Sequence, residues 1–193
     1  MSRFINYLTE QGKGKGIHFI DVDQTLFSTF AKIHVVDKET GEIKKKLSNQ
    51  EFNSYQLKQG EEFDFKEFED ANLFRKTSQP IKPVIEKVKK IINYIKRNAK
   101  GSKVIFLTAR ADFDNKREFL NAFKDQGIDV DFKSNVYIER AGNLKQGTVP
   151  QKKEKIIMSY LKKENYRRVR MLDDYTGNLD NFLQIAKKVP QEI

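Results

Sequence analysis

The chain has 193 residues, with 37 Lys and Arg against 27 Asp and Glu, which gives a formal charge of +10. This length suits one domain, because single cores are common at roughly 100 to 200 residues. Hydrophobic residues make up 38% of the sequence, which excludes collagen-like and wholly disordered chains. Cysteine is absent and the only histidines are His18 and His34, which excludes disulfide frameworks, thiolate metal sites and multi-histidine metal sites.

The sequence predicts neither a membrane span nor a signal peptide. No apolar run approaches the roughly 18 to 20 residues that cross a bilayer, and the start of the chain has no apolar segment of the signal-peptide kind. We therefore expect a cytoplasmic protein with no membrane partner. The excess of positive charge favours polyanionic partners or phosphorylated substrates, although lysine-rich surfaces also serve solubility.

Short apolar runs alternate with segments of helical periodicity. Strands are predicted at residues 17–20, 104–107, 136–138 and 169–172. Helices are predicted at residues 82–98, at 113–126, from Thr148 and Pro150 to about Leu161, and from Leu179 to Ala186. Strands that alternate with helices of this length predict an α/β fold with a mainly parallel sheet covered on both faces.

Residues 28–80 interrupt this alternation. Segments 31–36 and 43–47 flank a Gly-containing loop of hairpin length, which predicts a β-hairpin. The aromatic-rich stretch that follows predicts short helices and loops. We expect an insertion packed beside the sheet within a single domain spanning 1–193, because about 50 residues seldom support a separate core.

Acidic and polar side chains follow three of the four predicted strands. They are Asp21 and Asp23 after the first strand, Thr108 at the end of the second, and Asp173, Asp174 and Asn178 after the fourth. Ligands bind beyond the carboxyl ends of parallel strands, so we expect these side chains to converge. Four carboxylates at one edge would repel one another unless a divalent cation lay among them, and hard oxygen ligands suit Mg²⁺. Metal-assisted phosphoryl chemistry is the reaction class indicated.

Three cationic residues are candidate substrate contacts. Arg110 lies two residues after Thr108, where its planar guanidinium can grip a second phosphate or a base edge. Arg75 and Lys76 are further candidates. His18 lies inside a predicted buried strand and is expected to be a packed core histidine.

The motif GKGKG at residues 12–16 superficially resembles a phosphate-binding loop. It precedes the first strand, and neither of its lysines is followed by Ser or Thr, so it is expected to be a flexible lead-in.

The order of these motifs resembles the haloacid dehalogenase superfamily. The matching pattern is Asp-x-Asp-x-Thr after one apolar strand, Thr after another, a downstream Lys, and Asp-Asp-x-x-x-Asn, spread over residues 17–182. The segments AKIHVVDKETGEI and LFRKTSQP are similar to those of small-cap, phosphatase-like proteins encoded by bacteriophages. The resemblance implies a Rossmann-like, three-layer α/β/α fold, with a small insertion after the first strand. Asp at the second acidic position implies phosphatase or phosphotransferase chemistry.

The resemblance also implies a role for each motif residue. Asp21 would be the nucleophile that forms an aspartyl-phosphate, and Asp23 would be the general acid and base. Thr108 would hydrogen-bond the transferring phosphoryl group. Mg²⁺ would be held by Asp21, the backbone carbonyl of Asp23, and Asp174. Two neighbours complete the implied metal site: Asp173, and Asn178 at a position where Asp is also common.

Three lysines compete for the remaining position. Lys152, Lys153 and Lys155 all lie in the first turns of one predicted helix, and only one of them can point inward. Lys153 fits the family pattern because it stands three and four residues before Ile156 and Ile157. Lys152 is the alternative.

The function expected from the resemblance is that of a Mg²⁺-dependent phosphohydrolase. The charge of +10 favours a phosphate on a nucleotide or a nucleic-acid end. An insertion that folded over the site would instead favour small phosphometabolites. The alternative is a catalytically idle fold that binds nucleic acid or protein, although a binding module has no use for mutually repelling carboxylates. The oligomeric state is left open.

Overall fold

A computed structural model describes residues 14–189. The predictions that concern the start of the chain, including Gly12 and Lys13 of the GKGKG motif, lie outside the described residues.

A four-stranded parallel sheet forms the centre of the molecule. It contains β1 (Gly16–Ile20), β7 (Lys103–Thr108), β8 (Val136–Arg140) and β9 (Arg168–Leu172), in the order β8-β7-β1-β9. Along β1, Ile17 and Phe19 face one side, His18 and Ile20 face the other, and all four are buried. Strands buried on both faces need near-continuous apolar runs, as β1 and β7 have. All four predicted strands are confirmed.

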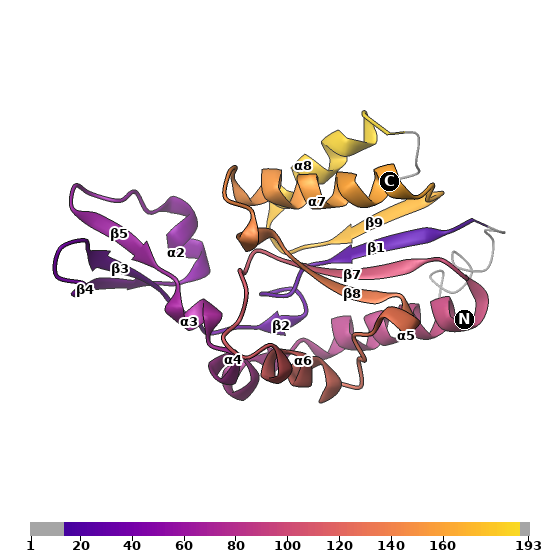
Figure 1. Cartoon of the computed structure of the whole chain (residues 1–193), viewed down its shortest axis with the longest axis horizontal. Helices are drawn as coiled ribbons and strands as arrows, with labels where there is room; N and C mark the ends of the chain where they lie inside the picture. The colour runs from indigo at the N-terminus through magenta and orange to yellow at the C-terminus, as the bar shows by residue number, and fades with distance from the viewer. Residues whose placement is uncertain (1–13, 190–193) are drawn as a thin grey trace.

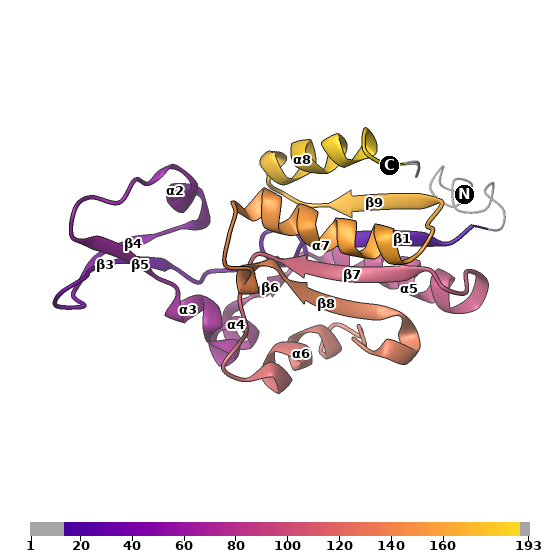
Figure 2. The ribbon, with the colours of Figure 1, turned by 45° about the horizontal axis from the view of Figure 1, so that its top comes forward.

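Helices cover both faces of this sheet (Figures 1 and 2). On one face lie α7 (Val149–Lys163) and α8 (Thr176–Ala186), which bury Phe19 and Tyr166 beneath them. On the other face lie α5 (Lys82–Asn98) and α6 (Lys116–Lys124), around Ile20 and Phe106. The architecture is mixed α/β and is compatible with a Rossmann-like fold.

The helix boundaries follow from their caps. Helix α5 starts with Pro83 in its first turn, where the missing N–H is tolerated, and it matches the predicted span. Helix α6 begins three residues later than predicted because the side chain of Asn115 caps it by accepting a hydrogen bond from the Glu118 amide. Two short 3₁₀ helices, Phe132–Ser134 and Ala141–Asn143, flank β8.

The insertion begins and ends on a small antiparallel pair, β2 (Phe27–Ser28) with β6 (Gln79–Pro80). Its three-stranded antiparallel sheet has the order β4-β3-β5, from β3 (Ile33–Asp37), β4 (Ile43–Leu47) and β5 (Glu61–Asp64). Its helices are α2 (Asn49–Ser54), α3 (Lys66–Glu69) and α4 (Ala71–Thr77). The predicted hairpin is thus present as β3 and β4.

The insertion carries its own apolar cluster, which differs from the expectation that it packs beside the central sheet. Ile33, Val35 and Leu47 are buried there, and Phe52 and Phe63 pack against them. The small sheet extends beyond the carboxyl ends of the central strands (Figure 1). Helix α4 joins the main core through Ala71 and Phe74. The aromatic residues after the hairpin supply enough apolar surface for this second cluster.

Between residues 14 and 189, none of the helices combines the length and the apolarity needed to cross a membrane.

Candidate active site

The predicted acidic residues meet at the carboxyl edge of the central sheet. Asp21 directly follows β1, and its amide donates a 2.8 Å hydrogen bond to the Leu172 carbonyl at the end of β9. This bond extends the pairing of β1 with β9 by one residue. It therefore holds Asp21 beside Asp173, the first residue after β9.

Lys153 lies between these two carboxylates. Its ammonium Nζ is 2.6 Å from Asp21 Oδ1 and 2.7 Å from Asp173 Oδ2, and the residue is only 2% exposed. Of the three candidate lysines, Lys152 is half-buried, and Lys155 is exposed and donates to the Gln146 carbonyl. The helix therefore turns Lys153 toward the sheet edge, as the spacing to Ile157 indicates.

Burial and charge shift the ionisation of this trio in opposing ways. Burial raises the pKa of Asp21 well above its usual range, which the Lys153 ammonium opposes, while Asp173 and Asp23 add to the shift. Burial alone would lower the pKa of Lys153, but attraction to Asp21 and Asp173 outweighs it and the pKa is raised. Lys153 therefore stays charged, and its ammonium favours the ionised form of Asp21.

Asp174 brings a third carboxylate to the same place. Oxygen atoms of Asp21, Asp173 and Asp174 all lie within 4.8 Å of one another. Thr25 orients Asp174 by donating to its Oδ1 over 3.2 Å and by accepting from its amide over 2.9 Å. Burial and the charge of Asp173 raise the pKa of Asp174.

Asn178 connects helix α8 to this cluster. Its Nδ2 donates to Asp173 Oδ1 over 2.8 Å, while its Oδ1 is buried and has no hydrogen-bond partner within residues 14–189. Three carboxylates and a buried amide oxygen that lacks a donor form a set of hard oxygen ligands. This donor chemistry fits Mg²⁺.

Asp23 is held on the other side of the site by Arg110. The guanidinium donates from Nε to both carboxylate oxygens at 3.1 and 3.0 Å, and from Nη2 to Oδ1 at 2.6 Å. Thr29 and Thr108 donate their hydroxyls to the same carboxylate at 2.8 and 3.3 Å. Burial would raise the pKa of Asp23, but Arg110 and the hydroxyl donors outweigh it and the pKa is lowered.

Arg110 lies inside the site and not on its surface, as it is only 3% exposed. Its Nη1 donates to the Phe68 carbonyl over 2.8 Å, and its guanidinium packs over the rings of Phe68, Phe74 and Phe113 at 4.4 to 5.5 Å. The predicted substrate contact is thus occupied by Asp23. Sequence reasoning did not find Thr29 or Phe68, because no local pattern marks them.

Arg75 and Lys76 are not brought to the carboxylates. Arg75 forms ion pairs with Glu118 at 2.7 Å and Asp125 at 2.9 Å, which join α4 to α6. Lys76 is exposed on α4. The geometry therefore assigns Arg75 to the contact between two helices, in place of the substrate contact predicted from sequence.

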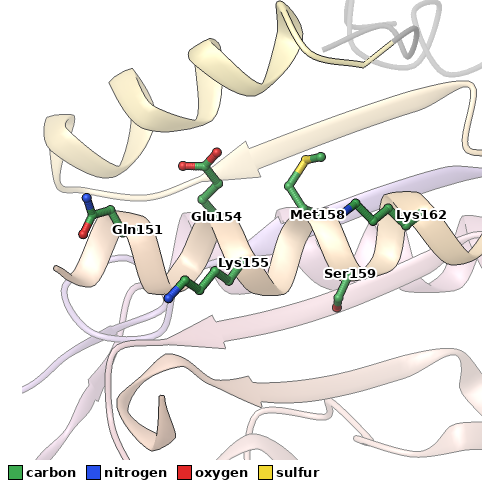
Figure 3. Close-up of a pocket in the computed structure, with 6 residues that line it drawn as sticks. All are labelled: Gln151, Glu154, Lys155, Met158, Ser159 and Lys162. Carbon is green, nitrogen blue, oxygen red and sulfur yellow. The ribbon is translucent and has the colours of Figure 1, made fainter. Parts of the chain in front are cut away.

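A hollow of about 590 Å³ lies on the outer surface of α7 (Figure 3). The residues that line it are Gln151, Glu154, Lys155, Met158, Ser159 and Lys162. At 3.6 residues per turn these positions share one side of the helix, and Lys153 and Ile157 lie on the opposite side. The hollow is therefore separate from the carboxylate cluster.

Comparisons of the chain with protein-family models, with curated proteins and with solved structures found no match.

Proposed function

We propose that this chain is a Mg²⁺-dependent phosphohydrolase of the haloacid dehalogenase type, acting through a phosphorylated Asp21. One observation carries the proposal: a buried ammonium, Lys153, lies between Asp21 and Asp173 at the carboxyl edge of a parallel sheet. Asp23 lies on the same loop as Asp21, with the Thr108 hydroxyl 3.3 Å from its carboxylate. This support is geometric and comes from the residues themselves.

The first half-reaction transfers the phosphoryl group to the protein. A carboxylate oxygen of Asp21 attacks phosphorus, a new P–O bond forms to Asp21, and the ester P–O bond breaks. The leaving oxygen takes a proton from Asp23. In the second half-reaction water attacks the same phosphorus and gives a proton to Asp23. The P–O bond to Asp21 then breaks, which restores the Asp21 carboxylate and releases phosphate.

Asp23 must carry a proton to protonate the leaving oxygen, yet Arg110 lowers its pKa in the substrate-free protein. We infer that a substrate phosphate draws the guanidinium away from Asp23, since phosphate and carboxylate compete for the same donors. Asp23 then loses the neighbouring positive charge of Arg110, which keeps its carboxylate ionised. Substrate binding and readiness for proton transfer are therefore linked through Arg110.

The ionisable cluster also fits the cation that this chemistry needs. Asp21, Asp174 and the backbone carbonyl of Asp23 would hold Mg²⁺, with Asp173 and Asn178 beside them. When bound, the ion neutralises charge on the phosphoryl oxygens. Lys153 adds a fixed positive charge beside Asp21 and so favours an anionic group there.

The substrate we propose is a phosphate on a nucleotide or a nucleic-acid end. The charge of +10 attracts such anions, and the small sheet of the insertion extends away from the central sheet. A metabolite phosphatase is the alternative within the same chemistry. We propose a cytoplasmic location, because the absence of cysteine suits a reducing compartment.

The test is phosphate release, with Mg²⁺ or with EDTA, from mononucleotides, oligonucleotides with 3′ or 5′ phosphates, sugar phosphates and a chromogenic ester. Asp21→Asn should abolish turnover, while Asp129→Asn, the same change at an exposed position outside the site, should not. The best substrate distinguishes end processing from metabolite hydrolysis. If the folded protein released no phosphate from any compound, the proposal would fail and a binding role would replace it.

A further inference from the structure

A second cavity lies at the amino ends of the central strands, which is the end of the sheet opposite to the carboxylate cluster. Its volume is about 340 Å³, and it is enclosed by the start of β1, the second half of α5 and the start of β9. Five cationic side chains line it: Lys15, Lys100, Arg167, Arg168 and Arg170. Within residues 14–189, no carboxylate belongs to its lining.

The edge position of β9 explains why arginines lie there. In the sequence Arg168-Val169-Arg170, Val169 is buried under α7 and α8, so its two neighbours face the side where α5 lies. They stand opposite Gly16 and His18 of β1 in the parallel register. A fully covered strand would carry apolar residues on this face, so two half-buried arginines mark a water-accessible space.

The described part of the GKGKG motif forms one wall of this cavity. The Arg167 amide donates a 2.8 Å hydrogen bond to the Lys15 carbonyl. A Cβ at Gly14 would lie 2.7 Å from the Arg167 Cβ, so a glycine is needed for Arg167 to pack over the chain at that point. The segment from Gly14 to Gly16 thus contacts the start of β9.

The positive charges near the cavity affect the ionisation of His18. His18 lines the cavity, and burial lowers its pKa to about 3, with Arg170, Arg168 and Lys87 adding to the shift. Within residues 14–189, Glu164 offsets part of this charge through a 3.5 Å ion pair with Lys15. Among the described residues that line the cavity, five are cationic and none is acidic.

We propose that this cavity binds a linear polyphosphate anion, either the phosphate chain of a nucleoside triphosphate or free polyphosphate. Guanidinium groups match phosphate oxygens in pairs, and three arginines and two lysines can engage successive phosphates. A volume of about 340 Å³ is within the range of small-ligand sites. Tyr94 and Ile95 on α5 form a less polar wall against which a base can lie.

This proposal is independent of the phosphohydrolase activity, and His18 offers a direct readout. The two histidines lie in different places, since His18 lines the cavity and His34 lies in the small sheet of the insertion. We would titrate the isotope-labelled full chain with inorganic tripolyphosphate and, separately, with ATP, both without Mg²⁺, and follow the imidazole signals. The His18 signals should shift and saturate, while those of His34 should stay in place.

Paired variants separate a built site from general attraction. The double variant Arg168→Gln with Arg170→Gln should weaken tripolyphosphate binding roughly tenfold or more, because two charged contacts are lost. The matched double variant Lys116→Gln with Arg117→Gln removes the same charge from an exposed part of α6 and should bind like the original chain. If the arginine variant does not fold, Lys100→Gln, an exposed change in the same cavity, should still weaken binding.

Four results would overturn the proposal. The first is a His18 signal that stays constant at millimolar tripolyphosphate. The second is equal weakening in both double variants, and the third is loss of binding in Asp21→Asn, which would move the ligand to the carboxylate edge. The fourth is an affinity for oligonucleotides that rises with their length and exceeds that for tripolyphosphate, which would indicate a nucleic-acid surface. Tighter binding of ATP than of tripolyphosphate would identify the nucleotide as the source of the phosphate chain.

Discussion

Replacing His18 by glutamine should remove part of the acid sensitivity of the fold. Burial, together with the nearby charges of Arg170, Arg168 and Lys87, lowers the pKa of the imidazole to about 3, compared with 6.5 for an unperturbed histidine. Below pH 6.5 the unfolded chain therefore binds a proton that the folded chain does not. Stability should fall as the pH drops from 6.5 toward 3, because protonation favours the unfolded state.

The size of this effect follows from the shift. At about pH 5 the solution is roughly 1.5 units below the pKa of the unfolded histidine, and each unit corresponds to ~1.4 kcal/mol. His18 alone should thus cost the protein about 2 kcal/mol of unfolding free energy between about pH 7.5 and pH 5. Other groups contribute to the total change, but they are shared with the variant.

Urea unfolding at both pH values gives the change in unfolding free energy on acidification. The contribution of His18 is the difference in this change between the original chain and His18→Gln. On acidification, the unfolding free energy of the original chain should fall by about 2 kcal/mol more than that of His18→Gln. His34→Gln, a change at the other histidine, should still show the decrease in unfolding free energy at low pH that His18 causes. Equal acid losses in the original chain and in His18→Gln would refute the reasoning, because His18 would then protonate freely in the folded state.

Three further predictions concern the site and the insertion. Lys153→Met leaves Asp21 and Asp173 without their shared cation. In EDTA it should lower the free energy of unfolding by about 3 to 5 kcal/mol, and Mg²⁺ should restore part of this loss in a calorimetric scan. Leu47→Ala opens the small cluster of the insertion at a cost of about 2 to 5 kcal/mol, so amide exchange should accelerate in β3 and β5 while β1 stays protected. Arg110→Lys cannot keep the forked contact with Asp23. Its kcat should fall roughly a hundredfold because the fork that positions Asp23 is lost. The basic limb of the pH–rate profile, which reports the protonated Asp23 that the first half-reaction needs, should move to higher pH as the pKa of Asp23 rises.

Matched variants give each of these predictions a control. Lys152→Met changes the neighbouring, half-buried lysine and should not respond to Mg²⁺. Leu183→Ala removes an exposed leucine and should leave exchange in the insertion unchanged. A Lys153→Met variant as stable in EDTA as the original chain would contradict the first prediction. Amide exchange in β1 as fast as in β3 would contradict the second. For Arg110, an unchanged pH–rate profile in the lysine variant would contradict the proposed control of Asp23.

The central sheet and its long helices are predictable because their signals are local. Four apolar runs and the stripe of α5 that includes Ile85, Val88 and Ile92 are visible in any short window of the sequence. Strand β5 is different, since Glu61–Asp64 is short and acidic and has no strand pattern of its own. It becomes a strand through its pairing with β3, in which Phe63 stands opposite Val35. Such pairing depends on residues far apart in the sequence.

The same distinction applies to the candidate site. Lys153 could be favoured over its neighbours because Ile157, one turn later, belongs to the buried face of α7. The partners of Arg75 could not be found in this way, because Glu118 and Asp125 lie more than 40 residues along the chain on another helix. A guanidinium seeks whichever carboxylates the fold brings near, and a short sequence window does not contain them.

Arg110 also explains how the insertion affects a site built mostly by the central sheet. Its guanidinium binds Asp23 with Nε and Nη2, and it donates from Nη1 to the Phe68 carbonyl, on the short helix α3 of the insertion. Movement of α3 away from the sheet would break the Phe68 contact and release one end of the guanidinium. The remaining contact with Asp23 would weaken, and the pKa of Asp23 would rise toward its ordinary value. The position of the insertion and the protonation of Asp23 are therefore coupled through one side chain. In the reaction that we propose, this coupling would let the insertion influence proton transfer by Asp23 through the contact between Arg110 and the Phe68 carbonyl.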